Sequence, residues 1–319
     1  MDPSWASQLE PPGADGSPSF VPLSSAAYTS RGYWNHRFSA EQSYDWLCRY
    51  AAVRPLLRGY CTALRPAREA RVLLVGNGNS SLAVDMAADG FGALTASDYS
   101  PVVVAAMAAR CANGDGDCSG DGGGDGSGGS DDSGGSGSGV DATARHTDAP
   151  ARSIRWVVAD MRDLRGFADA SLDAVVDKAA MDAVLADGGD VWPGEAPPEL
   201  LATARDILAA AARVLAPGGV YLQLTFSQPH FRRQYLAQAP ELWASLTPHA
   251  LDVGLGLTLW AAVRAGAREE GGKGEGEGER QDDGKRQGGT VEEEPARGGR
   301  AASEGAGGGG GGGEGLEAG

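Results

Sequence analysis

The 319-residue chain lacks a long apolar segment, an excess of basic residues and any Cys-x-x-Cys pair. No apolar run approaches the roughly 20 residues of a membrane-spanning helix, so we expect no membrane partner. Its 27 Lys and Arg are outnumbered by 43 Asp and Glu, which leaves no basic patch for a nucleic acid. The four cysteines, and an N-terminus without the features of a signal peptide, predict a reduced, cytoplasmic protein without a metal site.

Glycine is abundant, with 50 residues, but it is concentrated in two segments. Residues 113–139 hold 13 glycines with six acids and no base, and residues 266–319 hold 21 glycines with 13 acids. These compositions, like that of the Pro- and Ser-rich residues 1–27, are typical of disordered chain. We therefore predict one folded domain at 28–265, interrupted by a disordered insertion at 113–150 and followed by a disordered tail.

Between these segments, short apolar runs alternate with stretches of helical periodicity. The predicted strands are 71–75, 93–98, 154–160, 172–177 and 220–226, with further candidates near 243–246 and 257–263. The predicted helices are 80–90, with Ser80 as its N-cap, 101–111 and 199–215, which the Pro-Gly-Gly sequence at 217–219 would end. This alternation predicts an α/β fold with a parallel sheet and helices on both faces. In such sheets, ligands bind beyond the carboxyl ends of the strands.

The first predicted strand runs into the sequence Gly-Asn-Gly-Asn-Ser at 76–80. Gly76 and Gly78 would let the backbone approach a ligand, although ordinary α/β units turn in the same way. Asp98 ends the second strand, 20 residues after Gly78. Its carboxylate suits the two hydroxyls of a ribose, or it caps the next helix. Ser81, where a dinucleotide motif has its third glycine, disfavours a nicotinamide or flavin cofactor.

The third and fourth predicted strands also end in polar residues. Asp160 and Met161 suit the amino group and the ring of an adenine. Asp177 is followed by Lys178, which in most proteins would form a surface pair with a neighbouring acid. Polar signals at four consecutive strand ends together predict a ligand site.

Eight segments carry a resemblance to a known family: YWNHRF (33–38), SYDWL (43–47), VLLVGNGNSSL (72–82), SDYSPVVVAAMAARC (97–111), VVADMRDL (157–164), SLDAVVDKAAMDAVL (171–185), RVLAPGGVYLQLT (213–225) and QPHFR (228–232). With them the chain resembles the class I, seven-β-strand S-adenosylmethionine-dependent methyltransferases. More closely, it is similar to the family of elongation factor 1-alpha lysine methyltransferase 4 and methyltransferase-like 13.

The resemblance implies a Rossmann-like, seven-stranded, mostly parallel sheet and S-adenosylmethionine as the cofactor. The cofactor-binding residues that it implies are Trp34, Phe38, Tyr44, Gly76, Gly78, Asp98, Tyr99, Asp160, Met161 and Lys178. Among these, the three N-terminal aromatic residues would form a lid over the cofactor, or would simply pack in the core.

The chain also departs from the family. Residues 179–181 are Ala-Ala-Met where the family usually has Gly-Thr-Leu, and only Asp182 is kept. We expect this change to affect the specificity for the acceptor more than the binding of the cofactor. Leu74 stands where many class I enzymes have an acid that serves the amino group of the cofactor, and Phe38 stands where the family usually has tyrosine.

The resemblance implies methylation of a protein lysine, with translation elongation factor 1-alpha as the partner and the enzyme a monomer. A lysine with its ordinary pKa of about 10.4 must enter deprotonated, which an apolar channel favours. Trp34, Tyr44 and Phe226 are candidates for the channel wall. No catalytic residue is assigned, because Asp177 and Asp182 could act as bases or as structural caps. A small-molecule methyltransferase and a non-catalytic cofactor-binding module remain alternatives.

Overall fold

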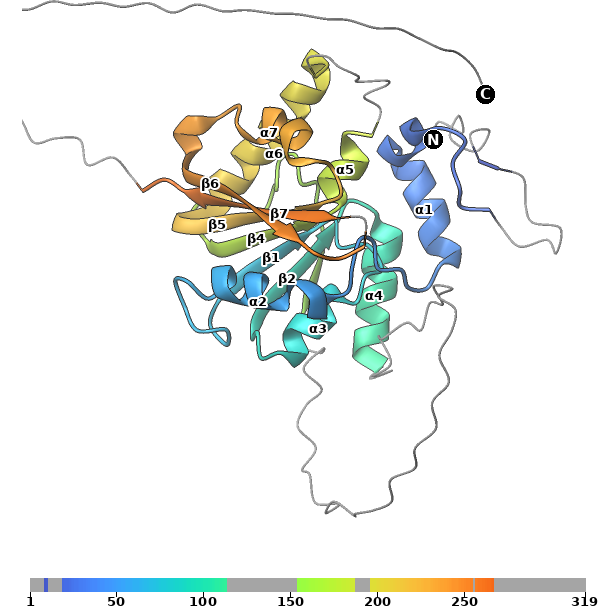
Figure 1. Ribbon diagram of the computed structural model, residues 1–319. Helices are drawn as coiled ribbons and strands as arrows, with labels where there is room; N and C mark the ends of the chain where they lie inside the picture. Colours follow the sequence, from blue (N-terminus) through green and yellow to red (C-terminus); the bar gives the residue numbers. More distant parts are fainter. Residues whose placement is uncertain (1–8, 11–18, 114–153, 187–195, 255, 267–319) are drawn as a thin grey trace, which may run out of the picture. The chain divides into compact units, whose positions relative to one another are not determined.

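The computed structural model describes residues 9–10, 19–113, 154–186, 196–254 and 256–266 (Figure 1). Every element described below belongs to the unit Met1–Arg268. The stretches predicted to be disordered lie largely outside the described residues, and their disorder remains a prediction. Among the described residues, no helix has both the length and the apolar character needed to span a membrane.

The elements follow the predicted alternation of strands and helices. The strands are β1 (Arg71–Val75), β2 (Ala93–Asp98), β3 (Arg155–Val158), β4 (Leu172–Lys178), β5 (Leu215–Thr225), β6 (Trp243–Leu251) and β7 (Leu257–Arg264). The helices are α1 (Arg31–Ala40), α2 (Tyr50–Cys61), α3 (Leu82–Ala88), α4 (Pro101–Asn113), α5 (Ala180–Val184), α6 (Pro198–Val214) and α7 (Pro229–Leu236), with 3-10 turns η2 (Ser25–Thr29) and η4 (Pro240–Leu242).

The strands form one seven-stranded sheet in the order β3-β2-β1-β4-β5-β7-β6. All neighbouring pairs are parallel except those of β7, which runs antiparallel to β5 and β6. This confirms the predicted Rossmann-like, mostly parallel sheet. The strand order reverses on the two sides of β1, where β2 and β4 are its neighbours, and ligands of such sheets bind at this switch point.

The two faces of the sheet carry separate apolar cores, because successive residues of a strand point to opposite sides. Val72 and Leu74 of β1 pack with α2 and α3 in one core, whereas Leu73 and Val75 pack with α5, α6 and α7 in the other. Figure 1 shows α2 and α3 on one side of the sheet and α6 and α7 on the other. The prediction of helices on both faces is therefore confirmed.

A third core joins residues 25–49, which we call the N-terminal lid, to α4. Trp34 and Phe38 of α1 pack there with Val103 and Met107 of α4, and Figure 1 shows α1 beside α4. Ordered contacts also begin before the predicted domain boundary at residue 28, since the backbone carbonyl of Phe20 accepts a hydrogen bond from Tyr33 at 2.9 Å.

Several predicted boundaries differ from the observed ones. Helix α3 begins at Leu82 with Ser81 as its N-cap, and Ser80 instead accepts a hydrogen bond from the Leu82 N–H through its hydroxyl at 3.1 Å. Helix α6 ends at Val214, before the Pro-Gly-Gly sequence, which belongs to β5. Gly218 has a φ of +76° there, and the pairing of β4 with β5 shifts register between residues 172 and 174.

The chain leaves α4 at Asn113 and re-enters the sheet at Arg155, and both points lie away from the switch-point edge. Because Arg155 pairs with Thr95 and Val158 pairs with Asp98, β3 starts at the amino side of the sheet and runs toward the carboxyl side. Helix α4 runs in the opposite direction, since it starts just after β2 ends.

Ala179, which links β4 to α5, generates the first prediction. Its φ of +66° is left-handed, which costs an L-residue about 1–2 kcal/mol, whereas glycine loses about 0.4–1 kcal/mol through the entropy of the unfolded chain. We expect Ala179→Gly to raise the free energy of unfolding by up to about 1 kcal/mol in urea denaturation. As a control, Ala211→Gly in α6 should lower it by about 1 kcal/mol. A lower free energy of unfolding for Ala179→Gly than for the wild type would show that the backbone at Ala179 is not strained.

Candidate functional site

The turn after β1 requires glycine at two positions. Gly76 has a φ of +56° and Gly78 a φ of +54°, both left-handed. A side chain at position 76 would collide with the Cβ atom of Ala180, and one at position 78 would lie 3.3 Å from the Cζ atom of Phe38. The turn is thus packed between α5 and the N-terminal lid.

Asp98 both organises this turn and faces the site. Its carboxylate accepts hydrogen bonds from the backbone N–H groups of Gly78 at 3.0 Å and Ser100 at 2.8 Å. Burial raises the pKa of Asp98 to about 6, against the pull of these hydrogen bonds. The contact with Ser100, just before α4, supports the capping role, and the position of Asp98 in the cavity described next is compatible with ribose binding.

A cavity of about 910 Å³ lies at the switch-point edge, within the range typical of small-molecule sites. The ten predicted cofactor-binding residues all line it: Trp34, Phe38, Tyr44, Gly76, Gly78, Asp98, Tyr99, Asp160, Met161 and Lys178. Phe226 and Asp182 line it as well, whereas Asp177 does not. The structure therefore brings the predicted residues together, and their contacts with a cofactor stay a prediction.

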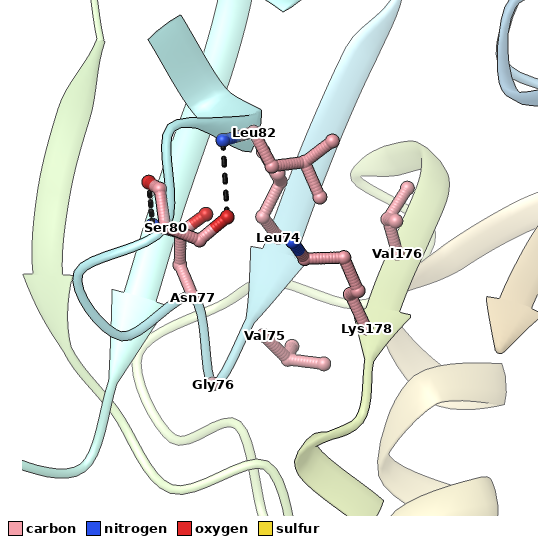
Figure 2. A pocket seen from close by; sticks show the side chains of 8 residues that line it. All are labelled: Leu74, Val75, Gly76, Asn77, Ser80, Leu82, Val176 and Lys178. Atoms are coloured by element: carbon pink, nitrogen blue, oxygen red, sulfur yellow. Dashed lines mark hydrogen bonds between the residues drawn. The ribbon is translucent and has the colours of Figure 1, made fainter. Parts of the chain in front are cut away.

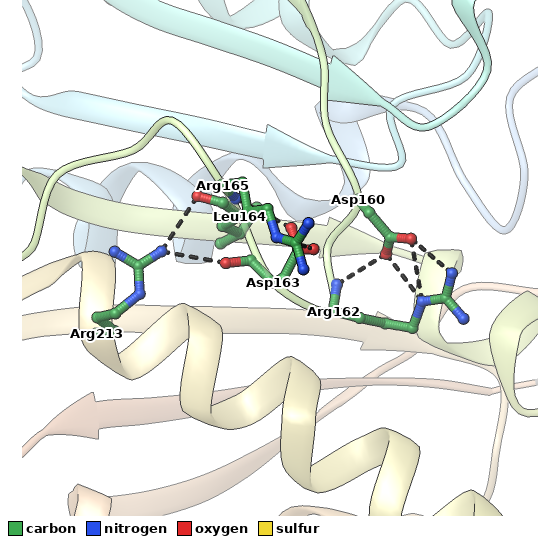
Figure 3. A network of polar contacts seen from close by, with 6 residues as sticks. All are labelled: Asp160, Arg162, Asp163, Leu164, Arg165 and Arg213. Atoms are coloured by element: carbon green, nitrogen blue, oxygen red, sulfur yellow. Dashed lines mark hydrogen bonds and ion pairs between the residues drawn. The ribbon is translucent and has the colours of Figure 1, made fainter.

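Asp160 has a partner that the sequence interpretation missed. Arg162 donates to it from the backbone N–H at 2.9 Å and from Nη2 at 2.6 Å, and Arg162 also lines the cavity (Figure 3). Burial acts to raise the pKa of Asp160, but the hydrogen bonds from Arg162 outweigh it and lower the pKa. In the same view Arg213 donates to the carbonyls of Asp163 and Leu164, which fixes the loop after β3 on α6.

The three predicted lid aromatics differ in exposure. Trp34 and Phe38 are buried and stacked, with ring centroids 5.4 Å apart, whereas Tyr44 is 45% exposed. Trp46, which was not predicted, lines the cavity beside them. The buried pair packs in the core and also forms part of the cavity wall, and its role as a lid over the cofactor stays a prediction.

Arg37 lies at the centre of these aromatic rings. Its guanidinium carbon is 5.0 Å from the ring centroid of Trp46 and 5.1 Å from that of Tyr44, at distances typical of cation–π contacts. Arg37 also pairs with Glu41, one helical turn later, at 2.6 Å. This buried cation therefore holds the end of α1 against the following segment of the lid.

Lys178 is not part of a surface pair, contrary to the most common pattern. Its side chain is 7% exposed, and its Nζ atom donates to Asp45 at 2.7 Å and to the carbonyl of Cys48 at 3.2 Å. Figure 2 shows Lys178 reaching from the end of β4 toward Ser80 on the turn, around a second cavity of about 10 Å³. Its acid is therefore Asp45 of the lid and not the adjacent Asp177.

The two candidate bases have different surroundings. Asp177 is fully buried, and its carboxylate accepts from the hydroxyl of Tyr221 and the backbone N–H of Ala180, both at 2.8 Å. Burial raises its pKa to about 6. Asp182 lines the cavity but accepts from Arg232 and from the hydroxyl of Thr225. These contacts favour a capping role for Asp177 and leave Asp182 already paired with a cation.

The residues at the turn fit S-adenosylmethionine. Asn77 lines both cavities, and its Oδ1 atom is buried without a hydrogen-bond partner in the part of the chain that the structure describes. Buried polar atoms of this kind normally have a partner. The amino group of the cofactor would supply this partner. Close by are Gly76 and Gly78, whose surroundings leave little room for a side chain, and the carboxylate of Asp98, which suits the ribose.

Comparisons with known proteins give similarities over most of the chain. EEF1A lysine methyltransferase 4 of Mus musculus is 31% identical over 231 residues, which cover 72% of this chain and 73% of that protein. Mitochondrial citrate synthase-lysine N-methyltransferase of Pongo abelii is 27% identical, covering 77% and 90%. Geranyl diphosphate C-methyltransferase of Streptomyces coelicolor, a solved structure, is 15% identical with a TM-score of 0.44, covering 76% and 98%. No family model matches the chain.

The buried carboxylate of Asp98 generates the second prediction. Because burial raises its pKa from 3.8 to about 6, lowering the pH through about 6 protonates it and removes an acceptor for the ribose hydroxyls. We expect the affinity for S-adenosylmethionine to fall by up to about tenfold per pH unit below that value. Titration calorimetry between about pH 5 and 8 measures this.

Asp98→Asn is the matched variant, since it keeps the size of the side chain. It should bind S-adenosylmethionine at least about tenfold more weakly, with no pH dependence in this window. A variant that keeps the wild-type pH dependence would show that another group is responsible.

Proposed function

Since this chain belongs to the S-adenosylmethionine-dependent methyltransferase family of EEF1A lysine methyltransferase 4, we propose that its acceptor is a lysine side chain of a protein, translation elongation factor 1-alpha. The observation that carries the proposal is the lining of a single cavity. Strand-end residues expected at the cofactor line it together with aromatic side chains that suit the apolar stem of a lysine.

The cofactor, when bound, supplies an electrophilic methyl group. The chain's own residues would bind and orient it: Asp98 would accept from the ribose, Met161 would pack against the adenine, and Asn77 would accept from the amino group. Methyl transfer of this kind depends mainly on alignment and on exclusion of water. The lid residues Trp34 and Phe38 line the cavity and would keep water from the reacting atoms.

The acceptor amine must be neutral to react. Tyr28, Trp46 and Phe226 contribute an apolar wall, which disfavours the ammonium form by desolvation. In this proposal the site selects the deprotonated lysine without a dedicated base, Asp177 serves as a structural cap, and Asp182 holds Arg232 in place.

A small-molecule acceptor is the second candidate, and one observation favours it. The Cβ atom of Ala180 lies against Gly76 in the segment where this chain departs from its family, so the acceptor side of the turn has changed. Trials with metabolites separate the two candidates, because turnover without protein labelling would identify a small-molecule enzyme. A non-catalytic module would bind the cofactor and label no acceptor.

The proposal also includes a monomeric enzyme in the cytoplasm. One relative is named as mitochondrial, so the compartment is to be measured with a tagged chain. Light scattering after gel filtration gives the oligomeric state.

The third prediction is a transfer assay. The purified chain with labelled S-adenosylmethionine should label translation elongation factor 1-alpha, and Asp98→Asn should label it much more slowly at the same cofactor concentration, because it binds the cofactor weakly. Mass mapping then locates the modified lysine, and citrate synthase serves as the comparison substrate. Labelling of citrate synthase alone, or of neither protein, would refute the proposed acceptor.

The fourth prediction concerns Phe226, which is 64% exposed and lines the cavity. Phe226→Ala should raise KM for the protein acceptor roughly five- to tenfold, because an exposed aromatic anchor is lost. Its affinity for the cofactor should stay unchanged. Val158→Ala is the control, since Val158 is 52% exposed but lies outside the cavity lining. An equal effect of both variants would argue against an acceptor contact at Phe226.

A further inference from the structure

The carboxylate of Asp45 connects the N-terminal lid to two parts of the sheet edge. Its Oδ1 atom accepts from Lys178 Nζ at 2.7 Å and from the hydroxyl of Ser80, and its Oδ2 atom accepts from the hydroxyl of Ser81 at 2.9 Å. Lys178 ends β4, and the two serines belong to the turn after β1. One side chain of the lid therefore contacts both strand ends that flank the switch point.

The position of Lys178 depends on the lid. Both acceptors of its ammonium, Asp45 and the carbonyl of Cys48, come from residues 41–49. The pair is largely buried, with side-chain exposures of 7% for Lys178 and 18% for Asp45. A buried cation without its partner is strongly disfavoured. Without the lid in this position, Lys178 would lose its counter-charge and its fixed place in the cavity.

Asp45 stays ionised in this place. Burial acts to raise its pKa, but the charge of Lys178 and the hydrogen bonds from Lys178, Ser80 and Ser81 outweigh it and lower the pKa. Strand β1 carries Leu74 near its end and brings no acid to the turn. The charged pair beside the turn thus consists of one residue from the sheet and one from the lid.

Other contacts of the lid meet the same turn. Asn79 donates from Nδ2 to the carbonyl of Glu41 at 3.0 Å, Phe38 lies against Gly78, and Ser100 donates to Asn35 at 2.6 Å. Asn79 also donates to the carboxylate of Glu41 at 3.1 Å, but that carboxylate already has its counter-charge in Arg37 of the lid. Asp45 differs from them because its partner is a charged residue that lines both cavities.

We propose that Asp45 is a positioning residue for S-adenosylmethionine, which acts by holding Lys178 beside the turn. Closure of the lid and assembly of the cofactor site are then a single step. The lid uses two of the three N–H groups of Lys178. The third N–H group would donate to the carboxylate of the cofactor. This inference rests on the cofactor of the proposed function and is independent of the acceptor.

The test compares variants by calorimetry with S-adenosylmethionine and by hydrogen exchange of residues 41–49. Asp45→Asn keeps the shape but loses the charge, and it should bind at least about tenfold more weakly and exchange faster in this segment. Asp45→Glu, which keeps the charge, should recover most of the affinity. Asp85→Asn is the matched control, because Asp85 contacts the same Ser81 hydroxyl at 2.7 Å and should bind within about twofold of the wild type.

A second comparison separates positioning from general stability. In a Lys178→Met background, Asp45→Asn should weaken binding by less than about threefold, because Asp45 acts through Lys178. The Lys178→Met protein has no buried ammonium group that loses its counter-charge when Asp45 is replaced. The comparison can therefore be made even if Asp45→Asn alone fails to fold. Independent, multiplicative effects of the two substitutions, or a folded Asp45→Asn protein with wild-type affinity, would overturn the proposal. Absence of binding by the wild type would overturn it together with the cofactor assignment, whereas failure to label the elongation factor would concern the acceptor alone.

Discussion

The parallel pairing of β1 with β2 on one side and β4 on the other is the constraint on which the site depends. Leu74 pairs with Ala96, and Val75 pairs with Asp177, so the three strands end level with one another. Parallel strands place their carboxyl ends at one edge, which brings Gly76, Asp98 and Lys178 together although they are far apart in the sequence. The turn, the cavity and the lid contacts all follow from this alignment.

The same alignment concentrates buried charge at one edge, and this has an energetic cost. Burial raises the pKa of Asp98 and Asp177 to about 6. A carboxyl whose folded-state pKa exceeds its unfolded value contributes stability that is lost as the pH rises through that pKa. At neutral pH these two buried carboxylates are therefore charged at a cost in stability, and hydrogen bonds from a bound ribose would offset part of this cost at Asp98. Sites of this kind commonly lose stability in exchange for function.

The sheet and the strand-end residues could be predicted because they follow local rules. Apolar runs marked the strands, and the rule for parallel sheets placed Asp98 and Asp160 at one edge. The lid contacts could not be found in this way, since Asp45 meets Lys178 only through tertiary folding across 133 residues. The adjacent Asp177 was a misleading partner, because successive residues of a strand point to opposite faces. The contacts of Arg37 with Tyr44 and Trp46 gave no signal either, since these rings lie outside the helix that carries Arg37.

The place where the chain leaves α4 and returns to β3 has a practical consequence. Asn113 ends a helix that runs away from the switch point, and Arg155 starts a strand that runs toward it. Each doubling of the length between these two points costs only about 0.6 kcal/mol of closure entropy. Evolution can thus lengthen or replace this connection freely without disturbing the reacting edge. The same junction is a natural position for fluorescent labels or fused domains in a working enzyme.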